Sequence, residues 1–241
     1  MSSKCRRRPD RRPPPLTRIL LPVLTSFRFE GTSQYLDDLV ARIDTPLLKT
    51  LKIAFFPQLS IDTPQLTHFI YRTPKFKIPD EARMVFSYEG LSVKLPRTFD
   101  GVFELAISQS DLPIASVEEV FISFFCQALI PMVERLYILE DILWRWDDFE
   151  NSEWLNLLRP FTALKDLYLC SGITRHIVPA LQELRLIGGR ATGVLPALQT
   201  IFLAEPVPSE LAQETIGPFI AARQLASPSI TISRWDGVRF D

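Results

Sequence analysis

The chain has few of the residues that most often build catalytic or metal sites. Its 241 residues include only two histidines and three cysteines. His68 and His176 fall within predicted helices, and neither has a nucleophile elbow beside it, so we interpret both as surface or helix-flank residues. Cys5, Cys126 and Cys170 are odd in number and lack metal-ligand spacing, which is typical of reduced thiols in an intracellular protein, cytoplasmic or nuclear. We therefore expect no enzyme, no metal and no cofactor.

Long apolar runs are also missing. The longest extends from Val120 to Val133 and is interrupted by Ser123, Gln127 and Pro131. Because a membrane helix needs about twenty largely apolar residues, this run is too short to span a bilayer. It is predicted to be a core helix, preceded by an S-x-x-E capping box at Ser116 and Glu119. We expect no membrane partner.

Glycine is scarce, with nine residues against twenty prolines. Many prolines and few glycines favour short elements that end abruptly, as in repeat proteins. Residues 188–193, GGRATG, have the outer glycine spacing of a phosphate-binding loop. Val194 and Leu195 follow where that loop needs lysine and serine or threonine, so we interpret the segment as a flexible turn.

Charge is distributed unevenly along the chain. Residues 1–18 hold seven basic residues and one acidic residue, a net charge of +6, and the remainder carries a net charge of −7. Residues 1–18 are rich in proline and nearly free of apolar side chains, so they are predicted to be a disordered tail. The alternative function that this tail suggests is association with nucleic acid through its basic residues, although the acidic body opposes it.

The clearest positive signal is a recurring phrase with an L-x-x-L-x-L core. A proline or a small residue is followed by an apolar residue, two polar residues, and then alternating apolar and polar positions. Repetition of such a phrase is typical of leucine-rich repeats, in which each copy adds a short strand to a stacked sheet. The copies are PVLTSFRF (22–29), PLLKTLKI (46–53), PMVERLYI (131–138), TALKDLYL (162–169), PALQELRL (179–186) and PALQTIFL (196–203).

The fold predicted from these phrases is α/β. We expect an irregular leucine-rich-repeat arc, or solenoid, over residues 19–241, with parallel strands and outer helices. Alternating apolar residues predict a β-rich interruption near residues 82–108 that includes a hairpin at Glu89-Gly90. Helices are predicted after a cap at Ser33, after a cap at Asp62-Thr63-Pro64 and near residues 155–160. The phrase at 179–186 lies only 17 residues before the next one, so it is predicted to form a helix from about 174 to 186. A last helix is predicted near residues 218–225.

Polar side chains between the inward leucines are candidates for partner contact. Because side chains alternate along a strand, we expect these residues on the concave surface of the sheet. They are Lys49, Lys52, Glu134, Tyr137, Lys165 and Tyr168.

The segment from Glu140 to Trp154 is the strongest local candidate for a binding site. It combines acidic and aromatic residues, which suit a basic peptide through charge attraction and cation–π contacts. The alternative is that Trp144 and Trp154 pack into the core while the acidic residues are simply solvated. The candidate contact residues are Trp144, Trp146, Asp147, Asp148 and Glu150.

Several segments together resemble the C-terminal leucine-rich region of fungal F-box-like proteins. They are residues 46–76, WLNLLRPFTALKDLYL (154–169), IVPALQEL, VLPALQTIFL, IGPFIAARQLAS and the late SRW, and the resemblance covers most of residues 35–236. In that family an F-box docks on a cullin–RING ubiquitin-ligase adaptor and the repeats select targets. No F-box is found before the first repeat, so the resemblance implies only a non-catalytic scaffold that recognises a protein partner.

Overall fold

The computed structural model describes residues 17–56, 63–76, 80–87, 90–95, 102–108, 132–140, 150–183, 194–204 and 230–236. Within them the chain is a mixed α/β protein, as predicted. The strands are β1 (Ile19–Leu20), β2 (Ser26–Gly31), β3 (Ile43–Asp44), β4 (Thr50–Phe55), β5 (Glu81–Ser87), β6 (Gly90–Leu95), β7 (Val102–Ser108), β8 (Arg135–Glu140), β9 (Asp166–Leu169), β10 (Thr200–Ala204) and β11 (Thr231–Trp235). The helices are α1 (Ser33–Val40), α2 (Pro64–Arg72), α4 (Asn151–Leu158) and α5 (Ser171–Glu183).

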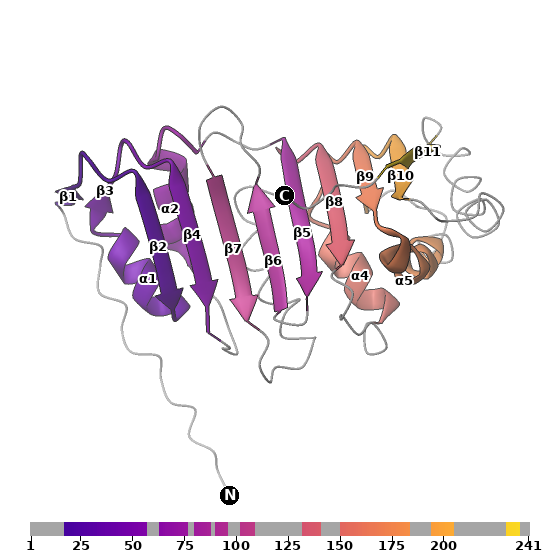
Figure 1. The fold of residues 1–241 in the computed structure, drawn as a ribbon, viewed down its shortest axis with the longest axis horizontal. Helices are drawn as coiled ribbons and strands as arrows, with labels where there is room; N and C mark the ends of the chain where they lie inside the picture. Colours follow the sequence, from indigo (N-terminus) through magenta and orange to yellow (C-terminus); the bar gives the residue numbers. More distant parts are fainter. Residues whose placement is uncertain are drawn as a thin grey trace, which may run out of the picture.

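One nine-stranded sheet runs along the length of the molecule in the order β11-β10-β9-β8-β5-β6-β7-β4-β2 (Figure 1). Its strand pairs are parallel except for the two made by β6, which lies antiparallel to β5 and β7. Strands β1 and β3 form a separate parallel pair at the β2 end. The predicted β segments near residues 82–108 are confirmed as β5, β6 and β7, which form the middle of the sheet.

Four copies of the recurring phrase, at 22–29, 46–53, 162–169 and 196–203, share one local structure. It begins with a turn in which a carbonyl accepts the N–H of the residue three positions later, and proline presets the backbone angle that such a turn needs. The N–H of Leu24 donates to the carbonyl of Leu21 (3.3 Å), Leu48 to Thr45 (3.2 Å), Leu164 to Phe161 (3.4 Å) and Leu198 to Leu195 (3.2 Å). After each buried leucine at positions 48, 164 and 198, two successive N–H groups donate to one carbonyl of the neighbouring copy. The N–H groups of Lys49 and Thr50 donate to the Thr25 carbonyl, and those of Lys165 and Asp166 donate to the Glu134 carbonyl. The N–H groups of Gln199 and Thr200 donate in the same way to the Lys165 carbonyl.

The strands that follow these turns are held in one register. Leu167 of β9 pairs with Leu136 of β8 and with Ile201 of β10, and all three side chains are buried. Two residues further along, Leu169 pairs in the same way with Ile138 and Leu203, which are buried too. At the other end of the sheet, Leu51 lies between Phe27 and Phe103. The apolar positions of successive copies therefore stack as continuous rows beneath the sheet.

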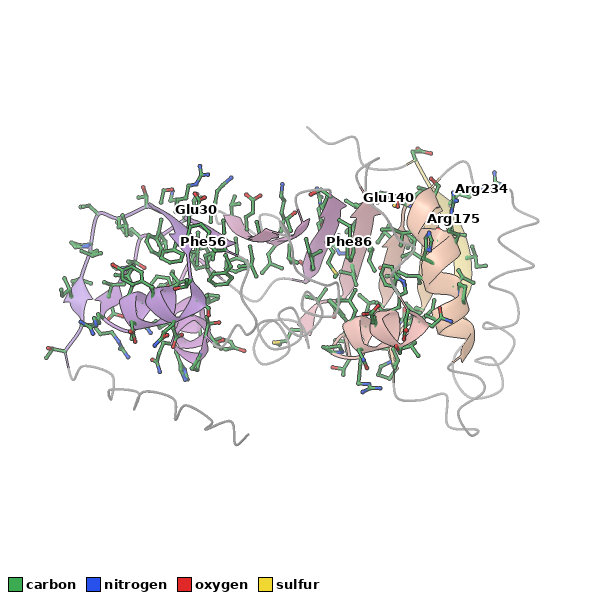
Figure 2. The ribbon with its side chains drawn as sticks, turned by 90° about the horizontal axis from the view of Figure 1, so that it is seen from below. Glu30, Phe56, Phe86, Glu140, Arg175 and Arg234 are labelled. Carbon is green, nitrogen blue, oxygen red and sulfur yellow. The ribbon has the colours of Figure 1, made fainter. Side chains whose placement is uncertain are left out.

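The helices cover the face of the sheet that carries these rows. Figure 2 shows α1, α2 and α4 on one side of the sheet. The apolar residues of α5 join the same core, among them Ile173, Ile177 and Leu181. Its bounds, Ser171–Glu183, show that the phrase at 179–186 begins in a helix, as predicted. Within the described residues, no helix is long and apolar enough to cross a membrane.

Helix capping at α1 and α2 differs from the prediction. Thr32, in an extended conformation, occupies the N-cap position of α1, and Ser33 is already its first helical residue, so the predicted cap at Ser33 is wrong. Thr63 and Pro64 do begin α2, but the hydroxyl of Thr63 makes no capping bond. The N–H groups at the start of α2 are satisfied instead by Asp37 of α1.

Several predicted segments lie outside the described residues. These are residues 1–16 of the basic tail, the apolar helix with its capping box, GGRATG at 188–193 and the helix near 218–225.

Candidate functional site

The face of the sheet opposite the helices carries a continuous row of large polar and aromatic side chains. No described element lies over this face, which we call the open face (Figure 2). Strand register places one residue from each strand in this central row. From β2 to β11 the row contains Arg28, Lys52, Glu104, Lys94, Arg83, Tyr137, Tyr168, Phe202 and Ser233.

The first half of the central row is charged. The Lys52 Nζ atom lies 2.8 Å from a Glu104 carboxylate oxygen, and the Lys94 Nζ atom lies 3.3 Å from the other. Burial alone would raise the pKa of Glu104, but hydrogen bonds and attraction from the two lysines hold it below its ordinary value. Arg28 is exposed and has no ion-pair partner among the described residues. This half therefore carries more positive than negative charge.

Arg83 lies at the boundary between the charged and aromatic halves. Its Nε atom donates to Glu81 at 3.0 Å, and its guanidinium carbon lies 5.4 Å from the centre of the Tyr137 ring. That distance is typical of a cation–π contact. Arg135 completes a small network, with one amino group 2.8 Å from Asp80 and the other 3.3 Å from Glu81. The hydrogen bond that Arg135 donates to Asp80 raises the pKa of Arg135, and the network holds Glu81 between Arg83 and Arg135.

The second half of the central row is a stack of aromatic rings. The Tyr137 and Tyr168 ring centres are 4.1 Å apart with planes inclined by 12°, and those of Tyr168 and Phe202 are 4.3 Å apart and inclined by 5°. Parallel strands place these residues side by side, which brings their rings face to face. The ring faces are largely occupied by neighbouring groups, so the stack directs its ring edges and hydroxyl groups outward.

Trp235 of β11 leans over this stack. Its ring lies edge-on to Tyr137 and Tyr168, at centre distances of 5.7 and 5.4 Å. Its indole N–H donates to the Leu169 carbonyl at 3.3 Å. Because Leu169 belongs to β9, the indole has to pass over β10, where the small side chain of Ala204 pairs with Trp235 in the register. We call Tyr137, Tyr168, Phe202 and Trp235 the aromatic shelf.

The surroundings of Tyr137 shift the pKa of its phenol. Burial and the negative charge of Glu81 raise the pKa of Tyr137 to about 12, and a hydrogen bond with Tyr168 adds to this effect. The phenol therefore stays protonated throughout the physiological range.

The local site predicted from the acidic and aromatic segment is only partly described. Trp144, Trp146, Asp147 and Asp148 lie outside the described residues. Glu150 is exposed at the N-cap of α4 and forms a capping box, in which its own N–H donates to Glu153 at 2.7 Å. Trp154 is fully buried, with its ring 5.8 Å from that of Phe86. Trp154 therefore packs in the core, as one of the two interpretations of this segment expects.

The six predicted strand residues divide into two groups. Lys52, Tyr137 and Tyr168 lie on strands in the central row. The placement of the other three on the strands is wrong, because Lys49, Glu134 and Lys165 each come one residue before a strand begins. There the doubled hydrogen bonds interrupt the simple alternation, and Lys165 pairs with Glu134 at 2.7 Å.

Sequence reasoning missed Phe202 and Trp235. Phe202 occupies the same place in PALQTIFL as Tyr168 does in TALKDLYL, so the alternation that identified Tyr168 applied equally to it. Trp235 had no comparable signal, because its contact with β8 and β9 depends on how far the indole leans across the sheet.

The remaining reactive side chains do not converge. His68 is exposed on α2, and His176 is half-buried on α5. Burial raises the pKa of the Cys170 thiol to about 11. Among the described residues, no three histidine, cysteine, aspartate or glutamate side chains are placed to hold a metal ion.

Comparisons of the chain with protein-family models, curated proteins and solved structures gave no match.

Proposed function

We propose that this chain is a non-catalytic protein-recognition scaffold of leucine-rich-repeat type, similar to the target-binding repeats of F-box-like proteins. The observation that carries this proposal is the open face, where register aligns charged and aromatic side chains in one row opposite the helices. Tyrosine, tryptophan and arginine are the residues most enriched where proteins bind one another. A broad sheet surface of this kind suits a polypeptide partner.

The repeat interpretation is supported by the turn and the doubled hydrogen bond that recur at the start of successive strands. In a repeat array each unit contacts its neighbours and adds one strand to a shared surface. Turns at Leu48, Leu164 and Leu198 with matching strand register fit that arrangement. The central β5–β7 segment is an insertion between two such groups of units.

The basic peptide predicted as a partner for Trp144, Trp146, Asp147, Asp148 and Glu150 remains a separate hypothesis. Only Glu150 lies among the described residues, and its side chain is engaged in capping α4. The nucleic-acid alternative depends on the basic tail, and it predicts that deletion of residues 1–15 abolishes salt-sensitive retention on RNA or DNA.

Recognition of polypeptides can be tested without knowing the partner. A random peptide library displayed on phage is selected against the immobilised protein, and the selected peptides are measured against the Tyr168→Ala variant. We expect peptides whose binding is weakened about tenfold or more in this variant, because truncation of an aromatic anchor removes much of the contact energy.

The matched control is His68→Ala, which alters an exposed side chain on α2. Circular dichroism of both variants establishes that they are folded. If every selected peptide binds the Tyr168→Ala variant as tightly as the unmodified protein, the open face is not the recognition surface.

A further inference from the structure

The two halves of the central row suit different parts of one ligand: the charged half suits carboxylates, and the aromatic half suits an apolar side chain. We propose that the open face binds an acidic segment of a partner protein, extended across the strands, with an apolar side chain anchored on the aromatic shelf. This inference rests on the proposed recognition function and names the chemistry of the partner.

The central row contains two pairs of like charges at neighbouring positions. Arg28 pairs with Lys52 in the register of β2 and β4, and Arg83 lies directly opposite Lys94 in the antiparallel pair β5 and β6. Like charges at facing positions of a sheet are destabilising. Four cations therefore share the row with one anion, Glu104, and this surplus of positive charge attracts an anionic partner.

Part of this positive charge is already neutralised within the protein. Glu104 is shared between two lysines, and Arg83 is paired with Glu81. Arg28 has no such partner in the described part of the chain, and two lysines compete for the one carboxylate between them. Carboxylates of a ligand would therefore find their best positions near Arg28, Lys52 and Lys94.

The aromatic shelf also bears on the chemistry of the partner. The Tyr168 ring is covered on both faces by Tyr137 and Phe202, so a nucleic-acid base cannot stack on it. Ring edges, hydroxyl groups and the partly exposed Trp235 indole suit an apolar side chain instead. The shelf therefore favours a polypeptide over a nucleic acid.

The strand order fixes the spacing that such a ligand needs. Lys94 on β6 and Tyr168 on β9 are separated by three strand intervals. At about 4.8 Å per interval this is about 14 Å, which an extended peptide spans with about four residues. Arg28 lies three intervals from Lys94 on the other side. The best ligand has acidic residues about four positions away from its apolar anchor.

Synthetic fluorescent peptides test this spacing directly. Each peptide contains an Asp-Glu pair, a Gly/Ser spacer of one, three or eight residues, and a leucine, and binding is followed by fluorescence anisotropy. We expect the peptide with the three-residue spacer, whose nearer acid lies four positions from the leucine, to bind most tightly. Its affinity should fall several-fold between low and high salt, because exposed charges are screened. A peptide with Lys-Lys in place of Asp-Glu, and single-stranded oligouridylate, are expected to bind at least about tenfold more weakly.

Two double variants identify the surface. Arg28→Gln with Lys94→Gln removes two cations of the row and leaves Lys52 beside Glu104. Arg175→Gln with Arg42→Gln removes two exposed cations outside the row and is the matched control. We expect about a tenfold loss of peptide affinity for the first pair and less than about a twofold change for the second.

The outcomes separate the inference from the proposed function. Equal binding of the lysine peptide or of the RNA, or no effect of the first double variant, overturns the acidic-ligand inference. If peptides selected from the library depend on Tyr168 but are neutral or basic, this inference is wrong and the recognition function stands. If no selected peptide depends on Tyr168, both are wrong.

Discussion

At the scale of single residues, the open face depends on a few side chains that the register places next to one another. Tyr137 is one of them, and it contacts Arg83 on one side, Tyr168 on the other and Trp235 above. These contacts hold the ring in one position. The shelf is therefore preorganised, which lowers the entropic cost of binding.

The raised pKa of Tyr137 predicts a specific dependence of stability on alkaline pH. In the unfolded chain a tyrosine loses its proton near pH 10.0, whereas Tyr137 in the folded protein keeps its proton to about pH 12. Its contribution to stability is therefore complete below pH 10 and is lost between about pH 10 and pH 12. We expect the free energy of urea unfolding to fall less steeply across this range in Tyr137→Phe than in the unmodified protein.

Tyr35→Phe removes a hydroxyl from a ring that is 69% exposed and is the matched control for this titration. The control should follow the unmodified protein. Parallel curves for the unmodified protein and Tyr137→Phe would contradict the assigned role of burial at Tyr137.

At the scale of elements, α1 and α2 are joined by side chains that complete each other's ends. The Asp37 Oδ1 atom accepts hydrogen bonds from the N–H groups of Gln65 (2.7 Å) and Leu66 (3.0 Å) at the start of α2. At the other end, Arg72 of α2 donates to the Val40 and Ile43 carbonyls and pairs with Asp44 at 2.7 Å. The two helices are thus fixed as one unit beneath β2 and β4.

Removal of the cap supplied by Asp37 should destabilise this unit. Asp37 is only 8% exposed, so its loss leaves two N–H groups at the start of α2 without their acceptor. We expect Asp37→Ala to lower the free energy of unfolding by about 1–2 kcal/mol, as for other helix caps. Chemical denaturation followed by circular dichroism measures this loss.

Asp38→Ala is the natural control, because Asp38 is the next residue of α1 and is exposed. It should change the free energy of unfolding by less than about 0.5 kcal/mol. An equal loss in the two variants would show that the charge of α1, and not the cap on α2, is responsible.

The sequence predicted elements better than it predicted their contacts. The alternation of apolar residues in β5, β6 and β7, and the spacing that made residues 179–183 helical, were sufficient to identify these elements. The cap from Asp37 was not predictable, because it joins residues 28 and 29 positions apart through tertiary contact. The placement of β7 beside β4 was not predictable either, since alternation identifies a buried face but not the neighbouring strand.

At the scale of the whole molecule, the sheet is long and each strand contacts mainly its neighbours. Helices α1 and α2 lie at the β2 end and α4 and α5 at the β8–β10 end (Figure 1). Stability in such an arrangement is divided among neighbouring units, as in repeat proteins, instead of being shared equally. Damage at one end should therefore remain local.

Two core substitutions test this separation. Leu51 and Leu167 are both fully buried, one between β2 and β7 and the other between β8 and β10. Each change to alanine should cost about 2–5 kcal/mol locally. In hydrogen exchange followed by mass spectrometry, Leu51→Ala should accelerate exchange in β2, β4 and β7, and Leu167→Ala in β8, β9 and β10.

Each variant serves as the control for the other in this comparison. Uniform acceleration along the whole sheet in both variants would show one cooperative unit and would contradict the local model.

The indole of Trp235 links the last described strand, β11, both to β9 and to the aromatic shelf. It bonds to Leu169 across β10 and covers the tyrosines, so one side chain both fastens β11 and completes the shelf. Loss of residues 230–236 would expose the backbone of β10 as a new sheet edge, open to self-association. The same loss would remove the Trp235 indole from Tyr137 and Tyr168. A chain without these residues would thus gain an exposed strand edge and lose part of the aromatic shelf together.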